Sequence, residues 1–284
     1  KDPKCEIYHN IGKDIIYFHC LFWPMMLKSA GYQTPKQIFV HGMLTVNGQK
    51  LSKSKGTFIN ASTYLKYFDP EYLRYYFACK LSSSISDIDL NLSDFVTRVN
   101  GDLIGKITNI ASRGFQMLEK KLQSRLGSVD EQGQVLVDRA RNLSETIATH
   151  YENRDFAKAL IEIRSIADSA NKYFDDHTPW KLINDDPEKT RQILTTILNL
   201  FRIIVIYLKP VMPNYSDKVA GLFAEKSYTW DDLSKTVEGQ TTGKFQHLLK
   251  RIEMKKVDKM LDESKLEKTR STVEKILLFC YNYN

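Results

Sequence analysis

The sequence predicts a mostly helical protein in three parts: the end of a doubly wound α/β domain, a small mixed α/β connector and an α-helical bundle. Helical and extended patterns alternate at the start of the chain. Short helix and strand signals follow, flanked by proline and serine. Beyond about residue 98 the strand signals stop, and long amphipathic segments succeed one another as in a bundle. We expect the three parts to span residues 1–43, 44–105 and 106–284.

The first part contains one helix and one strand. Apolar and aromatic residues recur at helical spacing between Asp14 and Met26, which predicts a helix that Pro24 bends or ends. Gly31 to Pro35 reads as a turn, and Gln37 to His41 as a short strand. The stripe of the predicted helix consists of Ile15, Phe18, His19, Phe22, Trp23 and Met26.

The connector carries several local start signals. Ser62 or Thr63 can cap a short helix. Asp69-Pro70-Glu71 is a stronger start signal, because it combines a capping carboxylate, proline at the first helical position and an acid in the first turn. Asp87 to Leu90 alternates like a strand, and Ser93 can cap the next helix.

The last part is predicted to be a bundle, because short breakers separate its amphipathic segments. The most apolar stretch, Ile193 to Met212, is interrupted by Asn199, Arg202 and Lys209, so we expect a buried helix there and not a membrane span. The predicted helices cover residues 98–122, 131–153, 155–174, 188–208 and 214–224.

Composition and charge indicate a globular protein with an anionic partner. The net charge of +7 is uneven: residues 1–56 hold eight lysines against three acids, and residues 244–275 hold ten Lys/Arg against six acids. The four cysteines lie far apart without zinc-ligand spacing, and charged residues interrupt any apolar run at the start, so we expect no metal ligands and no signal peptide. These features predict reduced thiols and a cytoplasmic protein.

The stretch Lys50-Leu51-Ser52-Lys53-Ser54-Lys55-Gly56 brings three lysines and two hydroxyls together ahead of a glycine. Such a loop can wrap a polyphosphate, since ammonium groups supply charge and hydroxyl and backbone groups supply directed donors. The alternative interpretation is a solvated basic turn.

Residues 39–57 around this loop resemble the signature loop of class I aminoacyl-tRNA synthetases, and residues 13–24 narrow the resemblance to the methionyl-tRNA synthetase family. The family motif is Lys-Met-Ser-Lys-Ser, from which Leu51 departs. The resemblance implies a Rossmann-like catalytic part, a stem-contact connector and an anticodon-binding bundle. It also implies ATP-dependent attachment of methionine to tRNA(Met), initiator tRNA included, through methionyl-adenylate. The expected substrates are methionine and ATP with Mg²⁺, with no membrane or DNA partner.

The resemblance also implies residue roles on the ATP side. Lys53 and Lys50 would be the catalytic cations that stabilise charge on the phosphates. Asp14 would receive the ribose hydroxyls, although an aspartate at a helix start needs no ligand, and His41-Gly42 could equally be a simple turn. The full set of expected ATP-binding residues is Gly12, Asp14, His41, Gly42, Leu44, Ser52, Lys53 and Ser54.

Two further sites follow from the same resemblance. Ile15, His19 and Trp23 would line a methionine pocket, since thioethers pack well against aromatic rings; the alternative is an ordinary buried helix stripe. In the bundle, Asn109 and Arg113 share a helix face and would read the CAU anticodon with Trp180. Without the resemblance, Arg113 would be interpreted as a surface ion pair and Trp180 as a core anchor.

The family's N-terminal His-x-Gly-His element is absent from this sequence. The resemblance therefore covers the C-terminal portion of the family's protein, without the first half of the sheet and the metal-binding insertion, where zinc would bind if at all. We expect this polypeptide alone to be inactive in adenylate formation but able to contact tRNA. The alternatives are an isoleucine, leucine or valine synthetase and a non-catalytic tRNA-binding module.

Overall fold

A computed structural model of the chain describes residues 4–50 and 59–266. The described residues form two compact units. The first contains residues 4–50, 59–63, 82–92 and 261–266, and the second contains residues 64–81 and 93–260.

The first unit begins with a parallel strand pair. Strand β1 (Tyr8–Gly12) lies beside β2 (Gln37–His41), with Gly12 opposite His41 at the carboxyl ends. The helical connection between them confirms the predicted helix but is irregular. It comprises a 3₁₀ turn (Lys13–Ile15), a π-helical turn (Phe18–Phe22) and helix α1 (Trp23–Ser29). Pro24 is the second residue of α1 and directly follows the π-helical turn, so the helical run does not end at this proline but continues to Ser29. Its missing N–H removes one hydrogen bond from the run at this point.

A three-stranded sheet follows, in the order β4-β3-β5. Strand β3 (Leu44–Val46) pairs antiparallel with β4 (Gln49–Lys50) through an Asn47-Gly48 turn in which both residues have positive φ. It also pairs in parallel with β5 (Ile88–Leu90), which confirms the predicted strand.

The helix starts of the connector follow the sequence only in part. Helix α3 (Pro70–Ala78) begins as predicted, with the Asp69 carboxylate accepting the Glu71 N–H at 2.9 Å. The predictions that Ser62 or Thr63 caps one helix and that Ser93 caps another were wrong. Helix α2 (Ala61–Tyr67) and helix α4 (Leu92–Arg98) each begin before the predicted capping residues, so Ser62, Thr63 and Ser93 lie inside helices. A serine or threonine alone fixes a start less firmly than aspartate followed by proline.

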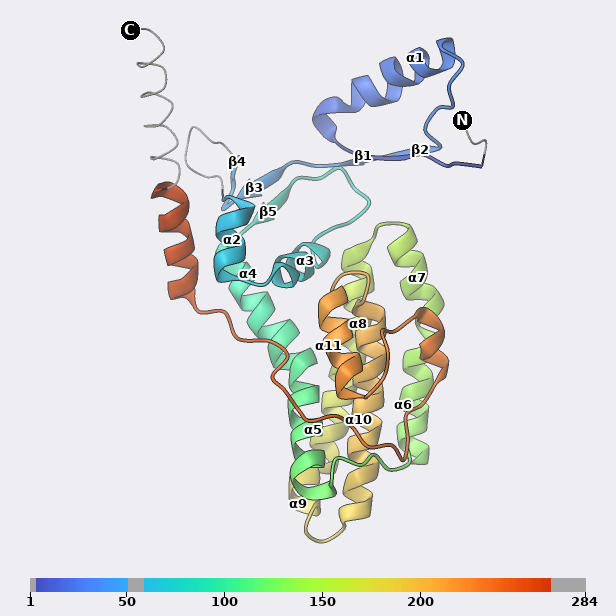
Figure 1. Cartoon of the computed structure of the whole chain (residues 1–284), viewed down its shortest axis with the longest axis vertical. Coiled ribbons are helices and arrows are strands. Elements are labelled where there is room, and N and C mark those ends of the chain that lie inside the picture. Colours follow the sequence, from blue (N-terminus) through green and yellow to red (C-terminus); the bar gives the residue numbers. More distant parts are fainter. Residues whose placement is uncertain (1–3, 51–58, 267–284) are drawn as a thin grey trace. The chain divides into compact units, whose positions relative to one another are not determined.

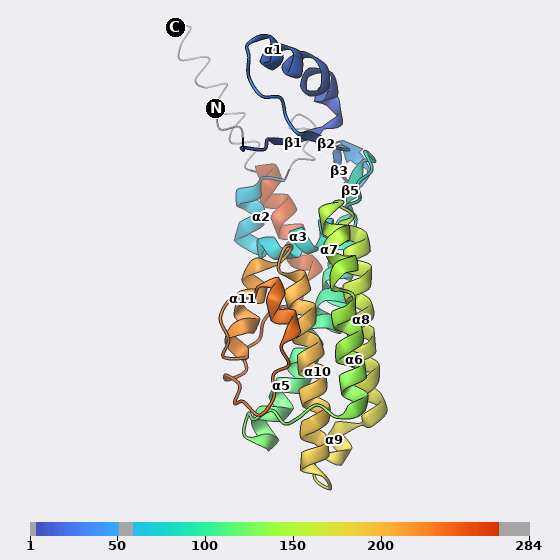
Figure 2. The same cartoon turned by 90° about the vertical axis from the view of Figure 1, so that its right-hand side faces the viewer.

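The bundle confirms the predicted helices except the one over residues 131–153, which is two helices that meet at Leu143. Helix α10 (Pro187–Leu208) lies at the centre of the bundle against α5, α6, α8 and α11 (Figures 1 and 2). A π-helical segment, Val99–Thr108, connects α4 to α5 without a break. The other helices are α5 (Asn109–Leu122), α6 (Glu131–Asn142), α7 (Ser144–Glu152), α8 (Phe156–His177), α9 (Pro179–Leu182) and α11 (Pro213–Leu222).

Helix α10 is long and apolar enough to cross a membrane by length and composition, but 89% of its most apolar window is buried inside the protein. The predicted buried helix is therefore confirmed. Its polar residues are used internally: the Asn199 amide donates to Thr195 and Val237 carbonyls and accepts the Val237 N–H.

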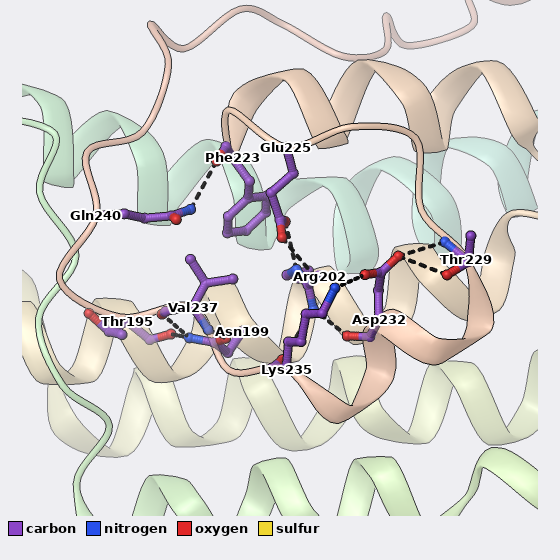
Figure 3. A network of polar contacts seen from close by, with 10 residues as sticks. All are labelled: Thr195, Asn199, Arg202, Phe223, Glu225, Thr229, Asp232, Lys235, Val237 and Gln240. Carbon is purple, nitrogen blue, oxygen red and sulfur yellow. Dashed lines mark hydrogen bonds and ion pairs between the residues drawn. The ribbon is translucent and has the colours of Figure 1, made fainter.

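Arg202 of α10 is fully buried and holds the segment that follows α11 (Figure 3). Its guanidinium donates to both carboxylate oxygens of Glu225, at 2.7 and 2.8 Å. It also donates to the backbone carbonyls of Asp232 and Lys235. The buried guanidinium charge is stable because its N–H groups donate to a carboxylate and to two backbone carbonyls.

Candidate functional site

An open groove of about 510 Å³ runs along α5 beside α9 in the second unit. We call it the α5–α9 groove. Its lining residues are Asn109, Ser112, Arg113, Gln116, Met117, Lys120, Lys121, Trp180 and Ile183.

The α5 residues of the groove form one stripe because they repeat every three or four positions. The opposite face of α5 packs into the bundle, where a Cβ on Gly114 would lie 2.8 Å from Leu198 Cδ2 of α10. This close approach fixes the rotation of α5 about its axis. The polar stripe is therefore turned away from the core and into the groove.

Arg113 contacts three side chains at the groove. Its Nη2 donates to Asp175 Oδ1 at 2.6 Å, and its guanidinium carbon lies 4.0 Å from the ring centroid of Phe174 and 5.7 Å from that of Trp180. Phe174 is buried, whereas 43% of Trp180 is exposed. The guanidinium is thus stacked and ion-paired before any ligand binds.

A sharp turn after α8 brings Trp180 to this place. Thr178 adopts a left-handed conformation with φ of 39°, which ends α8, and Pro179 then starts the short helix α9. The ring centroids of Trp180 and Phe174 lie 5.5 Å apart, and the angle between the ring planes is 34°. Trp180 is therefore a half-exposed platform and not the core anchor of the alternative interpretation.

The structure brings Asn109, Arg113 and Trp180 together on one groove. Arg113 also makes the ion pair of its alternative interpretation, so it lines the groove and is ion-paired at the same time. Phe174 was not among the predicted site residues, because it carries no local signal beyond that of a core aromatic. Lys120 and Lys121 were not predicted either, although a spacing of seven from Arg113 places Lys120 on the same helix face.

On the first unit, Gly12, Asp14 and His41 gather at the carboxyl ends of β1 and β2. A Cβ on Gly12 would lie 2.7 Å from Asp14 Oδ1 and 3.9 Å from His41 Cε1. His41 Nδ1 is 2.8 Å from the Gly42 carbonyl oxygen. Ligands of open α/β sheets bind at this end of the strands, so the geometry suits a small polar ligand.

Residues 86–89 contact and hydrogen-bond the segment that follows His41. A Cβ on Gly42 would lie 2.1 Å from the Ser86 carbonyl oxygen, so only glycine fits there. Asp87 Oδ1 accepts from Met43 N at 2.7 Å and from Lys13 Nζ at 2.6 Å; the hydrogen bonds to these two donors hold the pKa of Asp87 below its usual value. Asp89 Oδ1 accepts from Thr45 Oγ1 and from Gly48 N, which fixes the turn before β4.

The expected methionine-pocket residues do not form a closed pocket among the described residues. Ile15 and Trp23 are 36% and 43% exposed, and His19 Nδ1 lies 3.2 Å from His9 Nδ1. The alternative of a buried helix stripe is wrong for the same reason. Leu44 lies in β3. Lys50 ends β4, and Ser52, Lys53 and Ser54 lie outside the described residues.

Two family models match the chain. Residues 1–115 match class I tRNA synthetases (M), and residues 125–267 match the anticodon-binding domain of methionyl tRNA ligase. A curated methionine–tRNA ligase from Bdellovibrio bacteriovorus is 56% identical over 265 residues, which are 93% of this chain and 39% of that protein.

The solved structures that match include Mycobacterium tuberculosis methionyl-tRNA synthetase bound by methionyl-adenylate, with a TM-score of 0.76 and 27% identity over 85% of this chain. The free form of that enzyme matches with a TM-score of 0.75 and 26% identity over 87% of this chain. The chain spans about half the length of these structures: 49% of the adenylate-bound chain and 50% of the free one.

Proposed function

Because this chain belongs to the methionyl-tRNA synthetase family of class I synthetases, we propose that it serves the attachment of methionine to tRNA, with its α5–α9 groove reading the anticodon. The observation that carries this proposal is the juxtaposition of Asn109, Arg113 and Trp180 on one open groove. The activity of the whole enzyme is part of the proposal, since the chain spans 39% of its curated relative.

The groove has the chemistry that reads unpaired bases. An exposed indole face stacks on a base, while a guanidinium and an amide donate and accept hydrogen bonds at base edges. The stacked Arg113 offers a fixed donor edge, which suits discrimination better than a freely moving cation. We propose the CAU anticodon of tRNA(Met), initiator tRNA included, as the ligand of Asn109, Arg113 and Trp180.

The first unit would supply the adenylate side of the reaction. A methionine carboxylate oxygen attacks the α-phosphorus of ATP and pyrophosphate leaves; a ribose hydroxyl of the tRNA then attacks the methionyl carbonyl, and AMP leaves. Asp14 and Gly12 would hold the ribose, and His41, Gly42 and Leu44 the adenine side. Lys50 and Lys53, with Ser52 and Ser54, would hold the phosphates of ATP, which binds with Mg²⁺ as its substrate complex.

Ile15, His19 and Trp23 remain our proposal for the residues that contact methionine. We also propose a cytoplasmic location, where the synthetase substrates ATP, methionine and tRNA are available.

Binding of RNA hairpins tests the anticodon role. The chain should bind a hairpin with CAU in its loop at least about tenfold more tightly than the same hairpin with a substituted anticodon, because each base read directly contributes about 1–3 kcal/mol. Arg113→Ala and Trp180→Ala should reduce this ratio. Equal affinities for the two hairpins in the wild-type chain would refute the role.

A further inference from the structure

We propose that the Lys120–Lys121 end of the α5–α9 groove is a binding site for the backbone phosphate of a single RNA strand. The strand is the one whose bases lie at Asn109, Arg113 and Trp180, so this inference rests on the proposed function. It adds a second subsite, which positions the strand and reads no base.

The placement of the two lysines along α5 supports this site. Lys120 lies seven residues beyond Arg113, two helical turns along the same stripe, or about 10 Å at 1.5 Å per residue. Stacked nucleotides rise about 3.4 Å each, so both positions fall within a stretch of about three nucleotides. A strand with its bases beside Trp180 therefore brings a phosphate to Lys120 and Lys121.

The charge of the groove also favours a phosphate. The groove is lined by three cations, Arg113, Lys120 and Lys121, and by no acidic residue. Asp175 already pairs with Arg113. In the part of the chain that the structure describes, no carboxylate lies within 4.0 Å of either lysine ammonium. The neighbouring Glu119 carboxylate accepts the Phe245 N–H at 3.2 Å and does not line the groove.

The groove wall between the two subsites suits the sugars and bases of the same strand. Met117 and Ile183 contribute apolar surface, and Gln116 contributes an amide. Such a wall accommodates sugars and base faces, while the exposed lysines serve as point charges for a phosphate. A competing explanation is that Lys120 and Lys121 merely complement the dipole at the last turn of α5. That role would affect stability and leave RNA binding unchanged.

The salt dependence of binding separates the two explanations. We compare the wild-type chain, the double variant Lys120→Gln/Lys121→Gln and the matched control Lys158→Gln/Lys226→Gln, whose lysines lie outside the groove. Fluorescence anisotropy measures the binding of CAU and anticodon-substituted hairpins across a KCl series, and thermal melts measure stability.

The groove variant should bind both hairpins on the order of tenfold more weakly at low salt, with an unchanged ratio between them. Its slope of log K against log[KCl] should be shallower by about 1.4, or about 0.7 for each lost phosphate contact. The control should match the wild type. Replacing single loop phosphates by methylphosphonate should weaken wild-type binding at one or two adjacent positions and leave the groove variant unaffected there.

An unchanged slope and affinity in the groove variant, in a wild-type chain that discriminates CAU, overturns the phosphate subsite and leaves the anticodon role intact. A lowered melting temperature with unchanged binding assigns the lysines to the helix dipole and overturns the subsite as well. If the wild-type chain does not discriminate CAU, the anticodon role fails, and the subsite fails with it.

Discussion

The guanidinium carbon of Arg113 lies 4.0 Å from the ring centroid of Phe174. Arg113 lies in α5 and Phe174 in α8, and Arg113 also lines the α5–α9 groove. A cation–π contact contributes about 0.5–2 kcal/mol and restricts the long side chain. Phe174 therefore acts as a positioning residue for Arg113.

Replacing Phe174 should weaken anticodon discrimination without removing RNA binding. Phe174→Leu keeps an apolar side chain but loses the ring under the guanidinium, so we expect about three- to tenfold loss of CAU affinity and a smaller ratio against a substituted hairpin. Phe174→Tyr should retain both. Phe156→Leu, on the same helix and away from the groove, controls for stability loss. A ratio that stays at the wild-type value in Phe174→Leu would exclude the positioning role.

Breaking the ion pair of Arg202 should destabilise the bundle. Glu225→Ala leaves a buried guanidinium with only two carbonyl partners, at an expected cost of about 2–3 kcal/mol in the free energy of unfolding. Urea unfolding followed by circular dichroism measures this value. As a control, Lys235→Gln removes an exposed charge whose ammonium pairs only with Asp232 among the described residues, and should change stability by less than about 0.5 kcal/mol.

Asp130 should give a pH-dependent contribution to stability. Burial raises its pKa, but the Lys189 ammonium at 2.6 Å and the Gly133 N–H outweigh burial, so the pKa of Asp130 is held below 3.8. A lowered folded-state pKa stabilises the protein above 3.8, and this stabilisation is lost as the pH falls through the folded value.

The matched variant is Asp130→Asn, because asparagine still caps α6 but carries no charge. We expect it to be about 1 kcal/mol less stable than wild type at pH 7 and nearly equal to it once the wild-type carboxylate is protonated. Urea unfolding at both ends of this range measures the difference. A constant difference at every pH would contradict the assignment.

The close approach at Gly42 should not tolerate a side chain. Gly42→Ala would place a Cβ 2.1 Å from the Ser86 carbonyl oxygen, so a backbone segment must move, and we expect a loss of about 2–4 kcal/mol. Gly221→Ala is the control, because its added Cβ meets nothing within 4 Å in a helix. It should be neutral or slightly stabilising. Hydrogen exchange of β2, β3 and β5 locates the effect, and unchanged exchange there would count against the steric argument.

We expect no methionine-dependent ATP–pyrophosphate exchange from the 284-residue polypeptide by itself. The side chains proposed to contact methionine do not form a closed pocket among the described residues, since Ile15 and Trp23 are 36% and 43% exposed. Binding of the CAU hairpin by the same preparation controls for folding. Exchange at the rate of an intact synthetase would overturn this expectation.

Much of the fold was predictable because its signals are local. The predicted helices follow the 3.6-residue apolar period, and the start of α3 follows from aspartate before proline. The predictions were wrong where the local signal was weak, as at Ser62, Thr63 and Ser93. The irregular π-helical turn at Phe18–Phe22 has no such signature.

The sequence by itself determined most of the helices and the helix face shared by Asn109 and Arg113, because both depend on spacing along one segment. Only the tertiary structure decided that Trp180 meets Arg113, that Phe174 lies beneath its guanidinium and that Ser86 approaches Gly42. These contacts join residues distant in the chain. Packing brings them together, and no local pattern of residues encodes which distant side chains will meet.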